Sequence, residues 1–477
     1  MTFNSVPYIA LLVVAVAIYW VLGPRPRRLF VFLAGVAFYA SWGLVFVWLP
    51  LLVAGIVYLV GHQIVKHTAR PGKWMWLGIS CLLFLLIFLK YRGFLFSDLR
   101  FLGLTLALSN NSTLKALAFP VGISFYTFEA ISYLIDLRQG RVKMPSFLDL
   151  CMFFFFWPNI LSGPIVRARE LMPQLRFEKT FEPQFIFEGA DRIVWGLVQK
   201  NVVANTLGIW VDRGFAQAGS GIPTTIDGWF LAVGFALQIY IDFAGYSNMA
   251  IGTARLLGVT LPENFRQPYH ARTPADFWTR WHMSLSRWVR DYLFFPINAN
   301  WMGAPLPLYL SLVGVMGLVG LWHGAGWGFV LWGLLHGVYL VIYRIYETFA
   351  GTSEWWKESA IVSWTWRVLT LVAITVAWVP FRAATLPTAG TILSSMFYRF
   401  ERGMTYGSVF YIYSLAVLLF CVVEPALMRK LTEIDEQSGT TGLSAFRVLG
   451  RPILYLVGLM LFLLFDEHNT QFIYSQF

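Results

Sequence analysis

Three of the seven histidines lie in or beside stretches where an ionisable side chain needs a specific environment. His323 follows Trp322 in LVGLWHGAGWG and has apolar residues on both sides. Because an ionisable residue inside a membrane segment is costly to bury, we interpret His323 as a functional residue. The residue types alone are equally compatible with a neutral histidine that is hydrogen-bonded to a carbonyl between helices. The other four histidines lie outside these stretches and are expected to be solvated or exposed: His62, His67, His270 and His468.

His282 lies in a segment, residues 263–300, that is rich in Trp and Arg and too polar to span a membrane. Six of its residues recur at helical spacing and predict an amphipathic helix at the membrane interface: Phe277, Arg280, Trp281, Ser284, Leu285 and Trp288. His282 and Ser286 are four residues apart and can share a helix face. No carboxylate stands where it would orient such a pair, so the sequence disfavours a Ser–His nucleophile.

His336 follows His323 by 13 residues. On one straight helix the two side chains would face different sides, although the glycines between them argue against a straight helix. We predict a packing role for His336. Metal chemistry is not expected, because the chain has no His/Cys cluster and its three cysteines (Cys81, Cys151 and Cys421) lie far apart in apolar runs.

Charged and polar residues are further candidates for substrate binding or for contacts between helices. Arg280, Arg287 and Arg290 can bind the phosphates of a substrate, or instead bind lipid phosphates or pair with Asp276 and Asp291. Five polar residues in apolar segments are interpreted as hydrogen-bonding or charge-pairing groups between helices: Glu129, Asp136, Asp242, Tyr246 and Asn248.

The elements that position these residues are membrane helices. Of the 477 residues, 57% are hydrophobic and only 13% are charged, which excludes a disordered chain, a disulfide scaffold and a nucleic-acid-binding domain. The formal charge of +11 is interpreted as anchoring of cytoplasmic loops to an anionic leaflet. The sequence therefore predicts an integral membrane protein of one domain, residues 1–477, with its motif-bearing core at about 120–345.

The fold class predicted is all-α and polytopic, with roughly 11–12 membrane helices and short re-entrant and interfacial helices. Cys151–Pro164 is the candidate re-entrant segment. The candidate spans are Pro7–Leu22, Leu29–Trp42, Val45–Val60, Trp74–Leu89, Ala116–Ile135, Ile193–Trp210, Trp229–Ile251, Leu306–Trp322, Gly328–Ile345, Trp364–Val379, Val409–Val423 and Ile453–Phe465.

Five polar-containing motifs occur in a fixed order: FPVGISFYTFEAISYLID, YIDFAGYSNMAIG, PENFRQPY, DFWTRWHMSLSRWVRDYLFFP and LWHGAGWGFVLWGLLHG. Together they resemble the membrane-bound O-acyltransferase family. Within it they are most similar to the branch of the bacterial alginate O-acetylation membrane subunit and related polysaccharide O-acetyltransferases. The resemblance implies a ring of helices around a central funnel or tunnel.

The resemblance also implies an enzyme, an O-acetyltransferase of the bacterial inner membrane. It implies that an acetyl group passes from cytoplasmic acetyl-CoA through the membrane, via an extracytoplasmic acetyltransferase partner, to an exported polysaccharide. Acetyl-CoA is then a substrate, and no cofactor, metal or nucleic acid is expected. The alternatives are transfer of D-alanyl or another acyl group to a cell-envelope polymer, and a non-catalytic transporter or flippase.

The family's signature histidine corresponds to His323, which we predict to be the general base, and its second histidine corresponds to His282. His282 can orient the acceptor or stabilise a developing oxyanion. Positions in the motifs that are predicted to bind substrate are Arg280, Trp281, Ser284, Arg287, Arg290, Asn264, Gln267, Tyr269 and Trp322.

Overall fold

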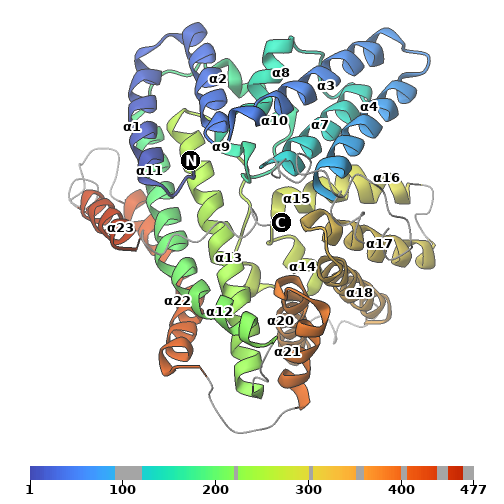
Figure 1. Cartoon of the computed structure of the whole chain (residues 1–477), viewed down its shortest axis with the longest axis vertical. Coiled ribbons are helices and arrows are strands. Elements are labelled where there is room, and N and C mark those ends of the chain that lie inside the picture. Colours follow the sequence, from blue (N-terminus) through green and yellow to red (C-terminus); the bar gives the residue numbers. More distant parts are fainter. Residues whose placement is uncertain are drawn as a thin grey trace. The chain divides into compact units, whose positions relative to one another are not determined.

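A computed structural model of the chain describes residues 1–91, 121–219, 224–299, 304–350, 359–398, 406–437 and 450–465 (Figure 1). Within these ranges every regular element is a helix, as predicted. The chain forms two compact units. Unit 1 comprises Met1–Ala190, Ala250–Glu263 and Arg290–Tyr292, and unit 2 comprises Asp191–Met249, Asn264–Val289 and Leu293–Phe477. The prediction of a single domain remains a prediction.

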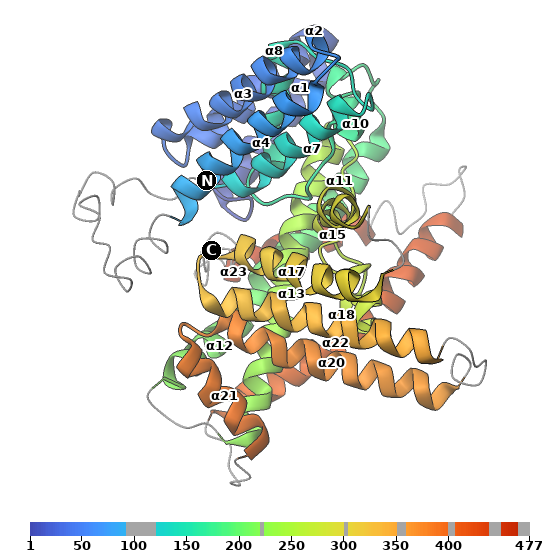
Figure 2. The same cartoon turned by 90° about the vertical axis from the view of Figure 1, so that its right-hand side faces the viewer.

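Unit 1 is built around α3, α4 and α7, which pack against one another (Figure 2). The contact is close because Gly78 on α4 has no side chain: a Cβ there would lie 2.7 Å from Leu134 and 2.9 Å from Val60. Its helices are α1 (Val6–Val21), α2 (Pro24–Ala40), η1 (Leu44–Phe46), α3 (Trp48–Lys66), α4 (Pro71–Leu86), η2 (Ile87–Tyr91), α7 (Ile123–Arg138), α8 (Phe147–Phe154), α9 (Trp157–Ile160), α10 (Ala168–Leu171), η4 (Gln174–Arg176) and the first half of α11 (Pro183–Leu197).

Unit 2 contains the three histidine-bearing segments. Its α17 and α18 lie side by side (Figure 1), and α18 also packs against α14 and α20. Its helices are the second half of α11, η5 (Val198–Ala204), α12 (Asn205–Gln217), most of α13 (Thr225–Leu256), η6 (Pro268–His270), α14 (Pro274–Trp278), α15 (Met283–Val289), the end of η7 (Arg290–Phe294), α16 (Phe295–Asn298), α17 (Pro305–His323), α18 (Trp327–Ala350), α20 (Ala360–Arg382), α21 (Leu386–Tyr398), α22 (Ser408–Gln437) and α23 (Arg451–Phe465).

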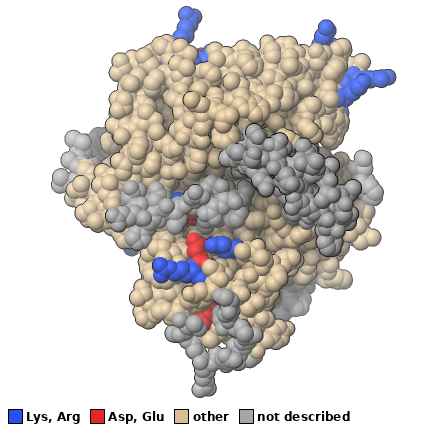
Figure 3. Space-filling view, in the orientation of Figure 1, with Lys and Arg blue, Asp and Glu red and all other residues tan. Residues whose placement is uncertain are grey.

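The chain is a multi-pass membrane protein. Six helical stretches of the described residues are long and apolar enough to cross a membrane: Leu44–Lys66, Pro71–Tyr91, Thr225–Leu256, Pro305–His323, Trp327–Ala350 and Ala360–Arg382. Three shorter apolar helices are Val6–Val21, Ser408–Glu424 and Arg451–Phe465. Charged side chains are sparse on the face drawn in Figure 3, as a lipid-facing surface requires. The count of 11–12 spans and the funnel remain predictions.

Two predicted segments differ in detail. The span expected at Ala116–Ile135 begins outside the described residues, and α7 within it starts at Ile123. The segment at Cys151–Pro164 forms the ends of short helices and irregular backbone, and all of its residues are buried. Irregular backbone inside a membrane is tolerated when protein covers it. The burial of this segment is therefore compatible with the predicted re-entrant segment.

The prediction of one continuous helix through Phe277 and Trp288 is wrong. The backbone leaves the helix after Trp278 and re-enters at Met283. His282 has a φ of +41°, in the left-handed region that a right-handed helix does not contain. A non-glycine residue in that region is strained, and such strain is concentrated at functional sites.

Candidate active site

His282 is held by a hydrogen-bonded network centred on Asn264. The side chain of His282 is fully buried, and its Nδ1 lies 3.0 Å from Oδ1 of Asn264. The same oxygen accepts hydrogen bonds from the Ser284 hydroxyl at 2.9 Å and from the Ser284 backbone N–H at 3.4 Å. Asn264 in turn donates through Nδ2 to Ser247 on α13 at 3.1 Å. Of the predicted substrate-binding residues, Asn264 therefore holds the ring of His282, and Ser284 shares the same Asn264 oxygen.

This network determines the tautomer of His282. Because the Ser284 backbone N–H can only donate, the Asn264 atom that it faces is the oxygen. An oxygen beside Nδ1 requires the proton on Nδ1, which leaves Nε2 as the acceptor nitrogen. Burial lowers the pKa of His282 to about 3, so the ring is neutral near pH 7. A neutral ring with an acceptor Nε2 can receive a hydrogen bond from a hydroxyl group.

His323 ends α17 and is only 3% exposed. Its ring lies 4.9 Å from the ring of Trp322 and 5.0 Å from that of Trp332, measured between centroids. The ring of His282 also approaches Trp322, at 6.4 Å. The structure therefore brings the two predicted catalytic histidines to the same tryptophan, although 40 residues separate them in sequence.

His336 belongs to the same aromatic cluster. The helix breaks after His323, and α18 runs back beside α17. This reversal brings Trp332 of α18 to His323, and His336 lies one helical turn after Trp332 with its ring 4.9 Å from that of Trp332. Two tryptophans thus connect three histidines: Trp322 lies between His282 and His323, and Trp332 lies between His323 and His336. The packing role predicted for His336 stays a prediction.

The remaining aromatic and polar candidates pack around this cluster. Trp281 is fully buried, and its ring lies 5.0 Å from that of Trp378 on α20. Tyr269 donates its hydroxyl to the Ala236 carbonyl at 2.5 Å, which ties the segment to α13. Gln267 has a φ of +49° and turns the backbone into η6. Trp281 and Tyr269 therefore act as structural supports in this conformation.

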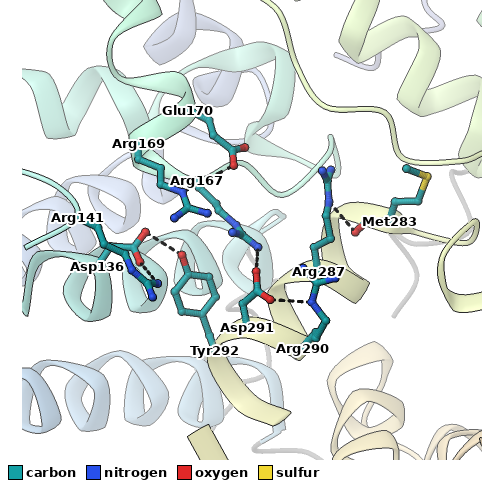
Figure 4. Close-up of polar contacts among 10 residues, drawn as sticks. All are labelled: Asp136, Arg141, Arg167, Arg169, Glu170, Met283, Arg287, Arg290, Asp291 and Tyr292. Atoms are coloured by element: carbon teal, nitrogen blue, oxygen red, sulfur yellow. Dashed lines mark hydrogen bonds and ion pairs between the residues drawn. The ribbon is translucent and has the colours of Figure 1, made fainter. Parts of the chain in front are cut away.

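Two of the three candidate arginines are paired with carboxylates. Arg280 donates to Asp276 at 2.8 Å, and Arg290 donates to Asp291 at 2.8 Å. Figure 4 shows Asp291 between Arg290 and Arg167, which both pair with it. Burial would raise the pKa of Asp291, but the two arginines outweigh it and hold the pKa below its usual value. Arg280 and Arg290 thus both make ion pairs with the aspartates that the sequence indicated.

The third arginine, Arg287, differs from the other two. Its Nε donates to the Met283 carbonyl at 3.3 Å, within the short helix α15 (Figure 4). Arg290 is 55% exposed despite its ion pair, so its guanidinium can reach a further anion. Arg290 is therefore more accessible to a phosphate than Arg280, whose side chain is only 23% exposed beside Asp276.

The buried carboxylates serve to connect elements, as predicted. Glu129 accepts from Asn159 at 2.8 Å, and Asp136 accepts from Tyr292 at 2.8 Å. In unit 2, Asp242 of α13 pairs with Lys200 in η5, and both side chains are almost fully buried. Lys200 was missed in the sequence, although a single lysine within the apolar run Ile193–Trp210 is a signal that could have identified it.

Comparison with known proteins identifies the class. A model of the membrane-bound O-acyltransferase family matches residues 104–379, and the chain belongs to this family. It is therefore an O-acyltransferase.

Relatives within the family differ in what their names say they modify. The chain is 35% identical to a probable alginate O-acetylase from Pseudomonas aeruginosa, over 83% of this chain and 75% of the relative. It is 33% identical to a peptidoglycan O-acetyltransferase from Helicobacter pylori, over 78% of this chain and 74% of the relative. It is 28% identical to a teichoic acid D-alanyltransferase from Bacillus subtilis, over 55% of this chain and 67% of the relative.

Proposed function

We propose that this protein takes an acetyl group from acetyl-CoA on the cytoplasmic side of a bacterial inner membrane and transfers it across for O-acetylation of an exported polysaccharide. The observation that carries the proposal is the convergence of His282 and His323 on Trp322 in an O-acyltransferase. The higher identity and coverage of the acetyl-transferring relatives support acetyl over D-alanyl as the acyl group.

The two histidines have different tasks in this proposal. Attack of a hydroxyl group on a thioester requires a base that removes the proton, and His323 supplies it. His282 is a weak base because its pKa is about 3, but its Nε2 can accept a hydrogen bond from the acceptor hydroxyl and orient it. The same Nε2 has no proton to give to an oxyanion, which favours orientation over oxyanion stabilisation for His282.

Acetyl-CoA carries several phosphates, and we assign phosphate binding to Arg290. A guanidinium presents a planar set of donors that match phosphate oxygens. The exposure of the Arg290 side chain, 55%, supports this assignment. Because His323 is buried, little water reaches the thioester beside it. Hydrolysis is therefore suppressed while the alcohol reacts. The polysaccharide receives its acetyl group through an extracytoplasmic acetyltransferase partner.

The experiment that tests this function measures thioester cleavage. The purified protein is placed in lipid vesicles with an extracytoplasmic polysaccharide acetyltransferase from the same organism, and acetyl-CoA is added on one side with a polysaccharide acceptor on the other. We expect free CoA to appear with the acceptor present and acetyl ester to accumulate on the far side. Consumption of a D-alanyl thioester in place of acetyl-CoA would contradict the assignment of acetyl as the transferred group. Passage of an intact lipid or glycan with no thioester consumed would contradict the enzyme assignment and favour a flippase.

A further inference from the structure

The proposed reaction gives no task to His336, although this side chain is among the most enclosed in unit 2. It is 1% exposed. Aromatic rings surround it at centroid distances of 5.1 Å for Trp278, 4.9 Å for Trp332 and 5.8 Å for both Phe277 and Tyr339. His336 therefore places its ring nitrogens inside an enclosure made of aromatic side chains.

Those polar atoms are unsatisfied within the described part of the chain. Nε2 of His336 is buried and has no hydrogen-bond partner there, and the same holds for the indole N–H groups of Trp278 and Trp332. Leaving a buried donor or acceptor without a partner costs about 1–3 kcal/mol. A phenylalanine would fill the position of His336 without that cost. Packing alone therefore does not account for a histidine, whereas a bound polar atom would.

The unsatisfied groups lie next to the proposed base. The ring of Trp332 contacts those of both His336 and His323, at centroid distances of 4.9 and 5.0 Å. The two helices that carry these residues approach closely, because a Cβ on Gly320 would collide with the Phe329 carbonyl and one on Gly333 with the Met316 carbonyl. Donors fixed on such closely packed helices are preorganised, and a low-dielectric setting strengthens their effect on developing charge.

We propose that the indole N–H of Trp332 and the Nε2–H of His336 bind the carbonyl oxygen of the transferred acyl group. This inference rests on the proposed function. When the acceptor oxygen bonds to the acyl carbon, its proton passes to His323, and the carbonyl π pair moves onto the oxygen held by Trp332 and His336. When the carbonyl reforms, the carbon–sulfur bond breaks and the departing thiolate takes the proton from His323.

The test compares His336→Phe, which removes the hydrogen-bonding group, with His336→Gln, whose amide N–H can replace it. His62→Phe is the matched control, because His62 is exposed in unit 1. Acetyl transfer in vesicles gives kcat and KM, and the melting temperature reports folding. We expect His336→Phe to lower kcat by about 10²–10³-fold with KM for acetyl-CoA nearly unchanged. We expect its melting temperature to equal or exceed that of the wild type, and His336→Gln to recover part of kcat. Trp332→Phe is expected to lower kcat in the same way.

Two results would overturn the inference. One is a folded His336→Phe protein with wild-type kcat. The other is a loss of activity in both His336 variants that parallels a lower melting temperature, which would assign His336 to packing. If the wild-type protein does not consume acetyl-CoA at all, the proposed function fails together with this inference. If the wild type does and His336→Phe has no effect, only this inference fails.

Discussion

Replacing His323 by glutamine is expected to lower kcat for acetyl transfer by about 10²–10⁴-fold, the usual contribution of a general base. Glutamine keeps a polar side chain of similar length but cannot accept the hydroxyl proton near pH 7. Because the ring of His323 is packed between Trp322, Trp332 and Phe381, the smaller change to glutamine preserves more of the packing than alanine would. The measurement is single-turnover acetyl transfer by the purified variant in vesicles.

The control for this variant is His62→Gln, which changes an exposed histidine in unit 1. It is expected to transfer acetyl groups at the wild-type rate. A pH–rate profile adds a second measurement. The wild-type rate should fall at low pH, where the catalytic base is protonated, and this acidic limb of the profile should be absent in His323→Gln. An unchanged limb in a variant that still turns over would assign the titrating base to another residue.

Replacing Asn264 by leucine is expected to have the second-largest effect. Leucine has nearly the same shape but leaves Nδ1–H of His282 and the hydroxyl of Ser284 without their shared acceptor. Each of these hydrogen bonds stabilises the folded state by about 0.5–1.5 kcal/mol, so the melting temperature should fall. The ring of His282 also loses the contact that fixes its tautomer, and misplacement of a reacting group can cost about 10²-fold in rate.

The matched variant Asn264→Asp separates the two effects. Aspartate keeps an oxygen for His282 and Ser284 but adds a negative charge, which favours the protonated ring and raises the pKa of His282. We expect its melting temperature to stay closer to that of the wild type than that of Asn264→Leu, with a rate that falls more steeply as the pH is lowered. Equal melting temperatures and rates for Asn264→Leu and the wild type would show that this network does not support the site.

The sequence predicts a membrane protein and indicates His323, because both predictions depend on composition and on local surroundings. The role of His282 was implied only by the resemblance of its motif to the family. The sequence cannot predict that Trp322 and Trp332 contact three histidines, because those contacts arise from the packing of α17 against α18 and from the backbone turn at His282 between α14 and α15. The left-handed backbone at His282 was also missed: the apolar spacing around it is helical, and the tertiary hydrogen bonds of Asn264 override that local preference. The pairing of Arg280 and Arg290 was available as an alternative, but only geometry could select it.

The central prediction is that acetyl transfer to an exported polymer requires His323. It is tested most directly in cells that lack the native protein, by complementation with wild type, His323→Ala or His62→Ala at equal amounts in the membrane. The measured quantity is the number of O-acetyl groups per sugar in the secreted polysaccharide. Wild-type acetylation is expected for His62→Ala, and none above background is expected for His323→Ala. Undiminished acetylation with membrane-inserted His323→Ala would contradict it.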